Sequence, residues 1–254
     1  MNTNISILGC GWLGKALAKS LISDNYSIKG STTKNENFPV LESLNITPFK
    51  IDIESNSPDV SHFLDTDVLI IAITSKHTSA FKHLIESIEK SNLKKVIFVS
   101  STSVYENTNS IVTEETLTKG TPLAKIEQLF INTNTFQTTI LRFGGLYGYD
   151  RQPGHFFKSA KPISNPKGYI NFIHQDDCIN IIKNIIQQEA FGYVFNACTD
   201  SHPTRKEFYS HEFKKVGRAA PIFDDSSINQ FKIISSEVMK SKLNYEFIYA
   251  DLMK

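Results

Sequence analysis

Short apolar runs separated by amphipathic stretches dominate the first 145 residues of the chain. Such runs are typical of parallel strands that are covered on both faces. The predicted strands are residues 5–8, 26–29, 47–53, 68–73, 96–99 and 138–141. Between them apolar residues recur at helical spacing, most clearly from Phe81 to Ile88. This alternation predicts an α/β protein with a Rossmann-type doubly wound parallel sheet and helices on both faces.

The pattern changes after Arg142. Residues 144–168 hold five glycines and three prolines, which predicts a loop-rich excursion. A strand over 169–173, a helix over 176–188, a helix opened by a capping box at Thr204 and Glu207, and a short helix over 236–243 followed by a strand complete the prediction. We expect a NAD(P)-binding domain over 1–150, to which 171–200 returns, and a small substrate-binding lobe mainly over 151–254.

Composition narrows the choice of partners. The chain has 27 basic and 26 acidic residues and a net charge of +1, so nothing favours nucleic acid or a membrane surface. Three scattered cysteines indicate neither a disulfide framework nor a metal site. The start of the chain has no secretion signal, which predicts a cytoplasmic protein. We expect a small-molecule substrate, no metal, and a monomer or homodimer.

A G-x-G-x-x-G turn follows the first predicted strand. Gly9 permits the tight turn, Gly11 allows the backbone to approach a diphosphate, and Gly14 allows close packing of helix and strand. Trp12 and Leu13 lie within the turn, where free N–H groups of the helix would face the diphosphate. The turn predicts binding of a nicotinamide dinucleotide.

The end of the second predicted strand bears on which dinucleotide is bound. A NAD site usually carries a carboxylate about twenty residues after the first glycine. Here the chain has hydroxyl and ammonium groups instead: Lys29, Ser31, Thr32, Thr33 and Lys34. A carboxylate would repel the 2′-phosphate of NADP, whereas these groups can bind it. NADP is therefore the favoured cofactor, with NAD left open.

Four segments together resemble the extended short-chain dehydrogenase/reductases, also called the NAD-dependent epimerase/dehydratase family. They are GCGWLG at 9–14, SSTSVYE at 100–106, LRFGGLYG at 141–148 and NFIHQDD at 171–177. The resemblance is strongest to shorter, atypical members related to nucleoside-diphosphate-sugar epimerases. It implies an oxidoreductase or epimerase acting on a small carbonyl, an alcohol or a nucleotide-sugar-like substrate.

The resemblance also implies catalytic residues, of which one is missing. In that family a serine or threonine hydroxyl holds the reacting oxygen, a tyrosine exchanges the proton, and a lysine four residues later lowers the tyrosine pKa. Ser101 matches the hydroxyl and Lys125 the lysine, but Thr121 stands where the tyrosine is expected. If Glu127 is aligned with the family's glutamate, Lys125 moves out of register. Tyr147 is the nearest candidate for another proton donor.

The remaining family positions are assigned to binding. The cofactor positions are Asp52, Ala72, Ile73, Thr74 and Ser100, and the substrate positions are Arg142, Gly144, Arg151 and His174. Asp176 is predicted to cap the following helix. Two functions stay open. One is an NADP(H)-dependent oxidoreductase or epimerase without the usual tyrosine, and the other is a non-catalytic NADP(H)-binding sensor or scaffold.

Overall fold

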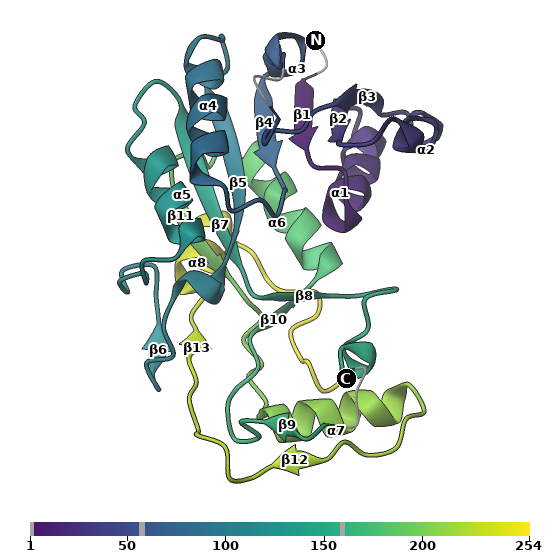
Figure 1. Ribbon diagram of the computed structural model, residues 1–254, viewed down its shortest axis with the longest axis vertical. Helices are drawn as coiled ribbons and strands as arrows, with labels where there is room; N and C mark the ends of the chain where they lie inside the picture. Colours follow the sequence, from purple (N-terminus) through teal and green to yellow (C-terminus); the bar gives the residue numbers. More distant parts are fainter. Residues whose placement is uncertain (1–2, 56–58, 158–160) are drawn as a thin grey trace. The chain divides into compact units, whose positions relative to one another are not determined.

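The structure is a computed structural model that describes residues 3–55, 59–157 and 161–254. A seven-stranded sheet has the order β11-β7-β5-β4-β1-β2-β3 (Figure 1). Its strands are β1 (Asn4–Leu8), β2 (Ser27–Thr32), β3 (Thr47–Lys50), β4 (Val68–Ile71), β5 (Lys95–Ser101), β7 (Gln137–Phe143) and β11 (Val194–Ala197). Strands β3, β2, β1, β4 and β5 pair in parallel. The predicted α/β, Rossmann-type fold is confirmed.

The strand order reverses beside the first strand. Strand β1 pairs with β2 on one side and with β4 on the other, so the chain winds outward in both directions from this point. In open parallel sheets, ligands bind beyond the carboxyl ends of the strands where the order reverses. Here those ends are followed by Gly9 after β1 and Ala72 after β4.

Helices cover both faces of this sheet. They are α1 (Trp12–Ser23), α2 (Phe38–Ser43), α3 (Ser61–Leu64), α4 (Thr78–Glu89), α5 (Pro122–Ile131) and α6 (Gln175–Gln187), with the 3₁₀ turn η1 (Asn35–Asn37). Figure 1 shows α4 and α5 side by side, and their buried faces join a core with Leu69 and Ile71 of β4. The alternate side chain Ile70 is also fully buried but lies outside that core, so β4 is covered on its other face as well.

The chain divides into two compact units that interleave along the sequence. Unit 1 is Met1–Ser100, Gly120–Leu141 and Ile182–Val194, and unit 2 is Ser101–Lys119, Arg142–Ile181 and Phe195–Lys254. The structure thus places the first change of unit after Ser100 rather than near residue 150. Of the segment 171–200 that was expected to return to the first domain, residues 182–194 lie in unit 1.

Unit 2 contains short strand pairs, the first part of α6 and two further helices in its described residues. The pairs are β8 (Gly145–Tyr147) with β10 (Phe172–His174), β9 (Ile163–Ser164) with β12 (Phe223–Asp224), and β6 (Ile111–Val112) with β13 (Ile233–Ile234). The helices are α7 (Arg205–Lys215) and α8 (Glu237–Leu243), with 3₁₀ turns η2 (Thr102–Val104) and η3 (Pro153–His155). Phe208, Tyr209 and Phe213 of α7 pack with Ile163, Ile170 and Leu252 as its core.

Buried Asp177 holds the segment that follows α8 in place. One carboxylate oxygen accepts hydrogen bonds from the Tyr245 hydroxyl at 2.7 Å and the Ile248 N–H at 2.8 Å, and the other accepts from the Tyr249 N–H at 3.1 Å. Charge-assisted bonds of this kind are among the stronger ones in proteins. Residues 245–249 are therefore fixed to the first turn of α6.

Several sequence predictions need correction. The capping box at Thr204 and Glu207 is present, and the helix predicted over 236–243 is α8. No strand follows α8 in the described chain, where residues 244–254 form turns and loop. The strand β11 was missed. Helix α6 begins at Gln175, so Asp176 lies in its first turn rather than at its cap.

Candidate functional site

The glycine turn between β1 and α1 is formed by contacts within the protein. Gly9 has φ +102°, and a Cβ added there would lie 2.7 Å from the Ala72 carbonyl oxygen. A Cβ added at Gly14 would lie 2.2 Å from the Gly9 carbonyl oxygen. Both positions therefore require glycine for the fold itself. Gly11 differs, because it is exposed at the start of α1 and a Cβ there would meet nothing within 4 Å.

The open space at Gly11 has a physical meaning. With no steric demand from the described protein, a glycine at this position leaves room for a ligand to approach the backbone. The turn lies at the reversal of strand order, and α1 presents its N-terminal end there. Free N–H groups and the positive end of a helix favour a phosphate. Leu13 is buried beneath the turn and Trp12 is half-buried beside it.

Ser31 fixes the glycine turn to the end of β2. Its hydroxyl accepts a hydrogen bond from the Gly9 N–H at 2.8 Å, and its carbonyl oxygen accepts one from the Cys10 N–H at 2.9 Å. The side chain is 2% exposed. Ser31 was predicted to contact the cofactor directly, but its hydroxyl is buried and engaged by the turn. Its role in this structure is to shape the turn.

Three exposed or half-exposed residues remain at the end of β2. Thr32 accepts hydrogen bonds from the Asn37 amide at 2.9 Å and the Lys34 N–H at 3.3 Å, while Thr33 and Lys34 are exposed. Lys29 is directed elsewhere, because its ammonium group donates to two carbonyl oxygens around the end of α3, at 2.7 and 2.6 Å. The positively charged candidate at this edge is therefore Lys34.

The other predicted cofactor positions in unit 1 follow the ends of β3 and β4. Asp52 is exposed, and its carboxylate accepts from the Glu54 N–H at 2.9 Å. The Ala72 N–H donates to the Leu8 carbonyl oxygen at 2.8 Å, which holds the end of β4 against β1. Ile73 is half-buried and Thr74 is exposed directly after it.

A buried pair that sequence reasoning missed links β5 to α5. The Ser100 hydroxyl donates a short hydrogen bond to the Glu127 carboxylate, and both side chains are buried. Two residues apart on a helix lie on nearly opposite faces, so Lys125 is turned away from Glu127, and it is exposed. Lys125 therefore does not take part in the Ser100–Glu127 pair, and its assignment as the family lysine stays a prediction. Thr121 caps α5 by accepting from the Ala124 N–H.

Ser101 begins unit 2 directly after this pair. Its hydroxyl oxygen accepts a hydrogen bond from the Ser103 N–H at 3.1 Å and so caps the turn η2. That bond uses a lone pair of the oxygen and leaves the hydroxyl proton available for donation. The local role and the proposed contact with a substrate oxygen are therefore compatible.

Arg142 belongs to a buried polar cluster in unit 2. It donates to the Tyr105 hydroxyl at 2.5 Å, and that hydroxyl donates to the Asn196 side-chain oxygen at 2.9 Å. Glu114 accepts from the Asn196 N–H at 2.7 Å. Arg142 was predicted to bind substrate, whereas the structure buries it and uses it to hold Tyr105. Gly144, another predicted substrate residue, packs closely against the backbone of Asn171, because a Cβ added at Gly144 would lie 2.6 Å from the Asn171 carbonyl oxygen.

Tyr147 lies in β8 and is half-buried. Its ring stacks on Phe172 at 6.2 Å and meets His174 edge-on at 5.1 Å. Burial and then the carboxylates of Asp177 and Glu212 raise the pKa of Tyr147. A phenol of raised pKa without a neighbouring cation is a weak acid near neutral pH. Tyr147 therefore lacks the environment that would make it equivalent to the family tyrosine.

His174 is held as a neutral ring. Its Nδ1 accepts from the Asp176 N–H at 3.2 Å, and burial lowers its pKa. The ring stacks on Tyr249 with 3.6 Å between centroids.

Arg151, another predicted substrate residue, is exposed, and its guanidinium lies 5.9 Å from the Phe156 ring.

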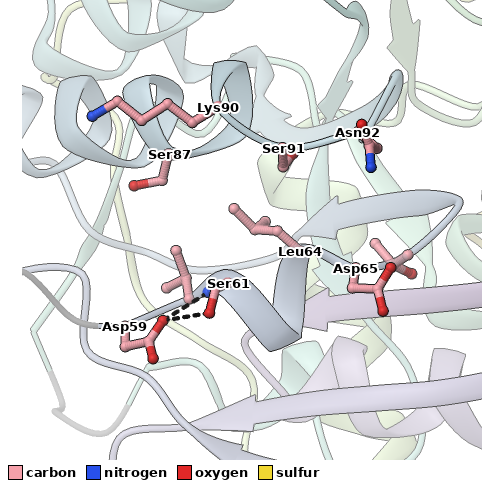
Figure 2. A pocket seen from close by; sticks show the side chains of 10 residues that line it. Asp59, Ser61, Leu64, Asp65, Ser87, Lys90, Ser91 and Asn92 are labelled. Carbon is pink, nitrogen blue, oxygen red and sulfur yellow. Dashed lines mark hydrogen bonds between the residues drawn. The ribbon is translucent and has the colours of Figure 1, made fainter.

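A separate hollow of about 400 Å³ lies on unit 1 between α3 and the end of α4 (Figure 2). Asp59 on one side accepts hydrogen bonds from the Ser61 N–H and hydroxyl, at 3.0 and 2.7 Å, which lower the Asp59 pKa. Lys90 lines the other side. Asp59 and Lys90 are both exposed, and none of the predicted site residues lines the hollow. Within the described chain, none of the helices combines the length and apolar character needed to cross a bilayer.

Known proteins resemble this chain in sequence and in fold. The model of a family described as NAD(P)H-binding matches residues 9–170. Protein YeeZ of Escherichia coli strain K12 is 29% identical over 265 residues, covering 97% of this chain and 96% of YeeZ.

Two solved structures share the fold. A conserved protein of unknown function from Silicibacter pomeroyi superposes with a TM-score of 0.83 at 17% identity, covering 99% of this chain and 96% of that one. UDP-glucuronic acid 4-epimerase from Bacillus cereus, in complex with NAD, gives 0.78 at 19% identity, covering 98% and 96%. The chain belongs to the NAD(P)H-binding family, and its fold is that of the NAD-dependent epimerases and dehydratases.

Proposed function

We propose that this protein is an NADP(H)-dependent oxidoreductase or epimerase that acts on a small carbonyl or alcohol, including one carried on a nucleotide sugar. One observation carries the proposal: the glycine turn is fixed by the protein's own contacts, while the space at Gly11 stays open. A turn kept in this form suits a diphosphate.

The preference for NADP rests on the edge after β2. Thr32, Thr33 and Lys34 offer hydroxyl groups and one ammonium group, and residues 29–34 contain no carboxylate. The 2′-phosphate that distinguishes NADP from NAD would be attracted by Lys34 and would meet no repelling charge from this segment.

When bound, the nicotinamide would supply hydride transfer. The chain's own contribution would start with Ser101, whose hydroxyl can donate to a substrate oxygen while its lone pair caps η2. Tyr147 stays protonated at neutral pH because its pKa is raised. It can therefore orient a substrate by hydrogen bonding, but it is poorly suited to release its proton.

Turnover with a panel of carbonyl substrates tests this proposal. NADPH oxidation would be followed for the wild type, Ser101→Ala and Tyr147→Phe. We expect Ser101→Ala to lower kcat/KM by about 10²-fold, since it removes a donor to the reacting oxygen. We expect Tyr147→Phe to act mainly on KM. Turnover that is unchanged in both variants would eliminate this active site.

A second function is favoured by two specific observations. Lys125 is exposed on α5, and the groups that raise the pKa of Tyr147 include no cation of the described chain. Both fit a non-catalytic NADP(H)-binding sensor or scaffold. Tight NADPH binding by calorimetry, without turnover of any carbonyl in the panel, would favour this function over the first.

A further inference from the structure

Unit 2 contains a cavity of about 640 Å³, a volume typical of small-molecule sites. It is lined by the loop after β8, the turn η3, α7 and the segment that follows α8, and every lining residue belongs to unit 2. Two of the predicted site residues, Tyr147 and His174, are part of this lining. The cavity is therefore the place in unit 2 where the chemistry of a ligand can be read from the residues around it.

One aromatic ring of the lining is largely uncovered. Tyr149 is 61% exposed, and its hydroxyl donates to Asp176 at 2.9 Å, which fixes the direction of the ring. The residue lies in a tight turn in which Gly148 and Arg151 exchange backbone hydrogen bonds at 3.1 and 2.8 Å. Its φ of +51° is uncommon for a bulky side chain and costs roughly 1–3 kcal/mol. The turn thus presents an aromatic ring where the backbone alone would favour glycine.

The lining also holds polar groups whose hydrogen-bonding capacity is unused. The Glu212 side chain is 8% exposed, and the ammonium group of Lys215 and the ring of His211 lie 3.9 and 4.0 Å from its carboxylate, beyond hydrogen-bond distance. Within the described chain the Tyr147 hydroxyl and the Gln152 side-chain amide make no hydrogen bond either. A carboxylate accepts several hydrogen bonds, and leaving a buried one without any is costly. These groups suit a ligand that brings its own donors.

The charges of the lining balance one another. Glu212 lies 3.9 Å from Lys215, and Asp251 lies 4.0 Å from Lys254, so each carboxylate has a lysine of its own. The two carboxylates in the first turn of α6 do not line the cavity and already accept hydrogen bonds from tyrosines and from the segment after α8. A ligand with a net charge would lose its hydration here without meeting an unpaired counter-ion. The balance therefore favours a neutral ligand.

We propose that this cavity binds a neutral hydroxylated ring, such as a sugar, in preference to a charged one. The hydroxyl groups of the ring donate to Glu212 and form hydrogen bonds with Tyr147 and Gln152. The apolar C–H face of the ring packs against the exposed ring of Tyr149. The inference deepens the proposed function and rests on it for the role of this ligand as substrate, whereas binding of the ring requires only the cavity.

The test compares neutral and charged forms of one ring. Glucose, galactose, mannose and myo-inositol would be titrated into the full chain and followed by NMR, with and without saturating NADPH. We expect at least one of them to bind with a Kd of about 10 mM or lower. Its amino and uronate forms, and cyclohexanol, should bind at least tenfold more weakly, about 1.4 kcal/mol. No binding by any neutral member, or a charged form that binds as tightly, would overturn the proposal.

The ring could be free or carried on a nucleotide. The UDP-linked form of the bound sugar would therefore be titrated beside the sugar itself, and tighter binding of the UDP-linked form would identify a carried ring. NADPH binding is measured separately by calorimetry. Sugar binding without NADPH binding would contradict the proposed function and leave the site in place, and NADPH binding without sugar binding would do the reverse.

Variants of Tyr149 test the stacking surface. Tyr149→Gly removes the ring, and glycine suits the backbone at φ +51°, so Tm should stay close to that of wild type while sugar affinity falls at least tenfold. Tyr149→Phe keeps the ring and should lose less affinity than Tyr149→Gly. Tyr193→Leu, at an exposed tyrosine of unit 1, is the control and should bind as wild type does.

Variants of Glu212 test the acceptor. Glu212→Leu removes both carboxylate oxygens and should weaken the sugar at least tenfold. Glu212→Gln removes the charge but keeps a carbonyl acceptor, so it should lose less affinity than Glu212→Leu. Sugar affinity that is unchanged in Tyr149→Gly or in Glu212→Leu would overturn the proposal.

Discussion

The Ser31 hydroxyl accepts a hydrogen bond from the Gly9 N–H at 2.8 Å, and this single contact joins the end of β2 to the glycine turn. Gly9 follows the end of β1 at Leu8, has a positive φ and is half-buried. A buried N–H without a partner is costly, and Ser31 supplies that partner. The turn is thereby held open before any ligand arrives.

Replacing Ser31 by alanine should weaken both the fold and the turn. The Gly9 N–H would lose its acceptor, so we expect Ser31→Ala to lower the free energy of unfolding by about 1–3 kcal/mol in denaturant titrations. NADPH and NADH affinities should fall together, because the turn serves the diphosphate that both share. Thr33→Ala, at an exposed position nearby, is the control and should leave stability unchanged. Equal stability of Ser31→Ala and wild type would contradict this role.

Gly11 and Gly14 should respond to alanine in opposite ways. A Cβ at Gly14 meets the Gly9 carbonyl oxygen at 2.2 Å, so Gly14→Ala should displace α1 and lower Tm. A Cβ at Gly11 meets nothing within 4 Å, so Gly11→Ala should keep the wild-type Tm. It should nevertheless weaken NADPH at least tenfold in calorimetry by filling ligand space. Full NADPH affinity in Gly11→Ala would show that no ligand approaches this residue.

Lys34 should discriminate between the two dinucleotides. The wild type should bind NADPH at least tenfold more tightly than NADH, about 1.4 kcal/mol. Lys34→Gln should reduce this ratio by weakening NADPH alone, because only NADPH carries the 2′-phosphate. Lys19→Gln on the exposed side of α1 is the charge-matched control. A ratio of NADPH to NADH affinity near one in the wild type would refute the preference. At high salt this ratio should fall, because salt screens the attraction between Lys34 and the 2′-phosphate.

Glu212 should make stability depend on pH. Because burial raises its pKa, the native protein holds this proton more tightly than the unfolded chain does. The resulting stabilisation is present at low pH and is lost as the pH rises through the raised pKa. Glu212→Gln should therefore be more stable than wild type at neutral pH. Each kcal/mol gained in the free energy of unfolding should raise Tm by about 2–4 °C.

The difference should disappear below the ordinary glutamate pKa of about 4.3. Glu237→Gln, which removes the same charge from an exposed position of α8, is the control measured over the same pH range. A wild type that is more stable than Glu212→Gln at neutral pH would reverse the sign of this prediction.

The main strands were predictable because their signal is local. Continuous apolar runs such as residues 68–71 are recognisable without knowledge of their neighbours. Strand β11 was missed because it is short and includes Asn196, whose polar groups are bonded by Tyr105 and Glu114 from far along the chain. Its partners could not be known from the sequence alone.

The parts of the site that depend on backbone conformation were predictable from the sequence. The parts that depend on which way a side chain points were less predictable. Glycines at 9, 11 and 14 describe the turn by spacing alone. Ser31, by contrast, lies in a strand whose two faces are both covered, so alternation along the strand does not show what its hydroxyl contacts. Lys125 and Glu127 differ by two positions on one helix, and only packing against Ser100 shows which of them faces inward.

The strand order also sets a problem for synthesis of the chain. Strand β5 ends at Ser101, but its outer neighbour β7 begins at Gln137, and β11, which pairs beyond β7, begins at Val194. While the ribosome produces the intervening residues, the apolar edge of β5 has no partner, and such edges attract other chains. Slow translation between residues 101 and 137 would prolong this exposure. Aggregation in cells should therefore respond to codon choice in that stretch more than to codon choice after residue 200.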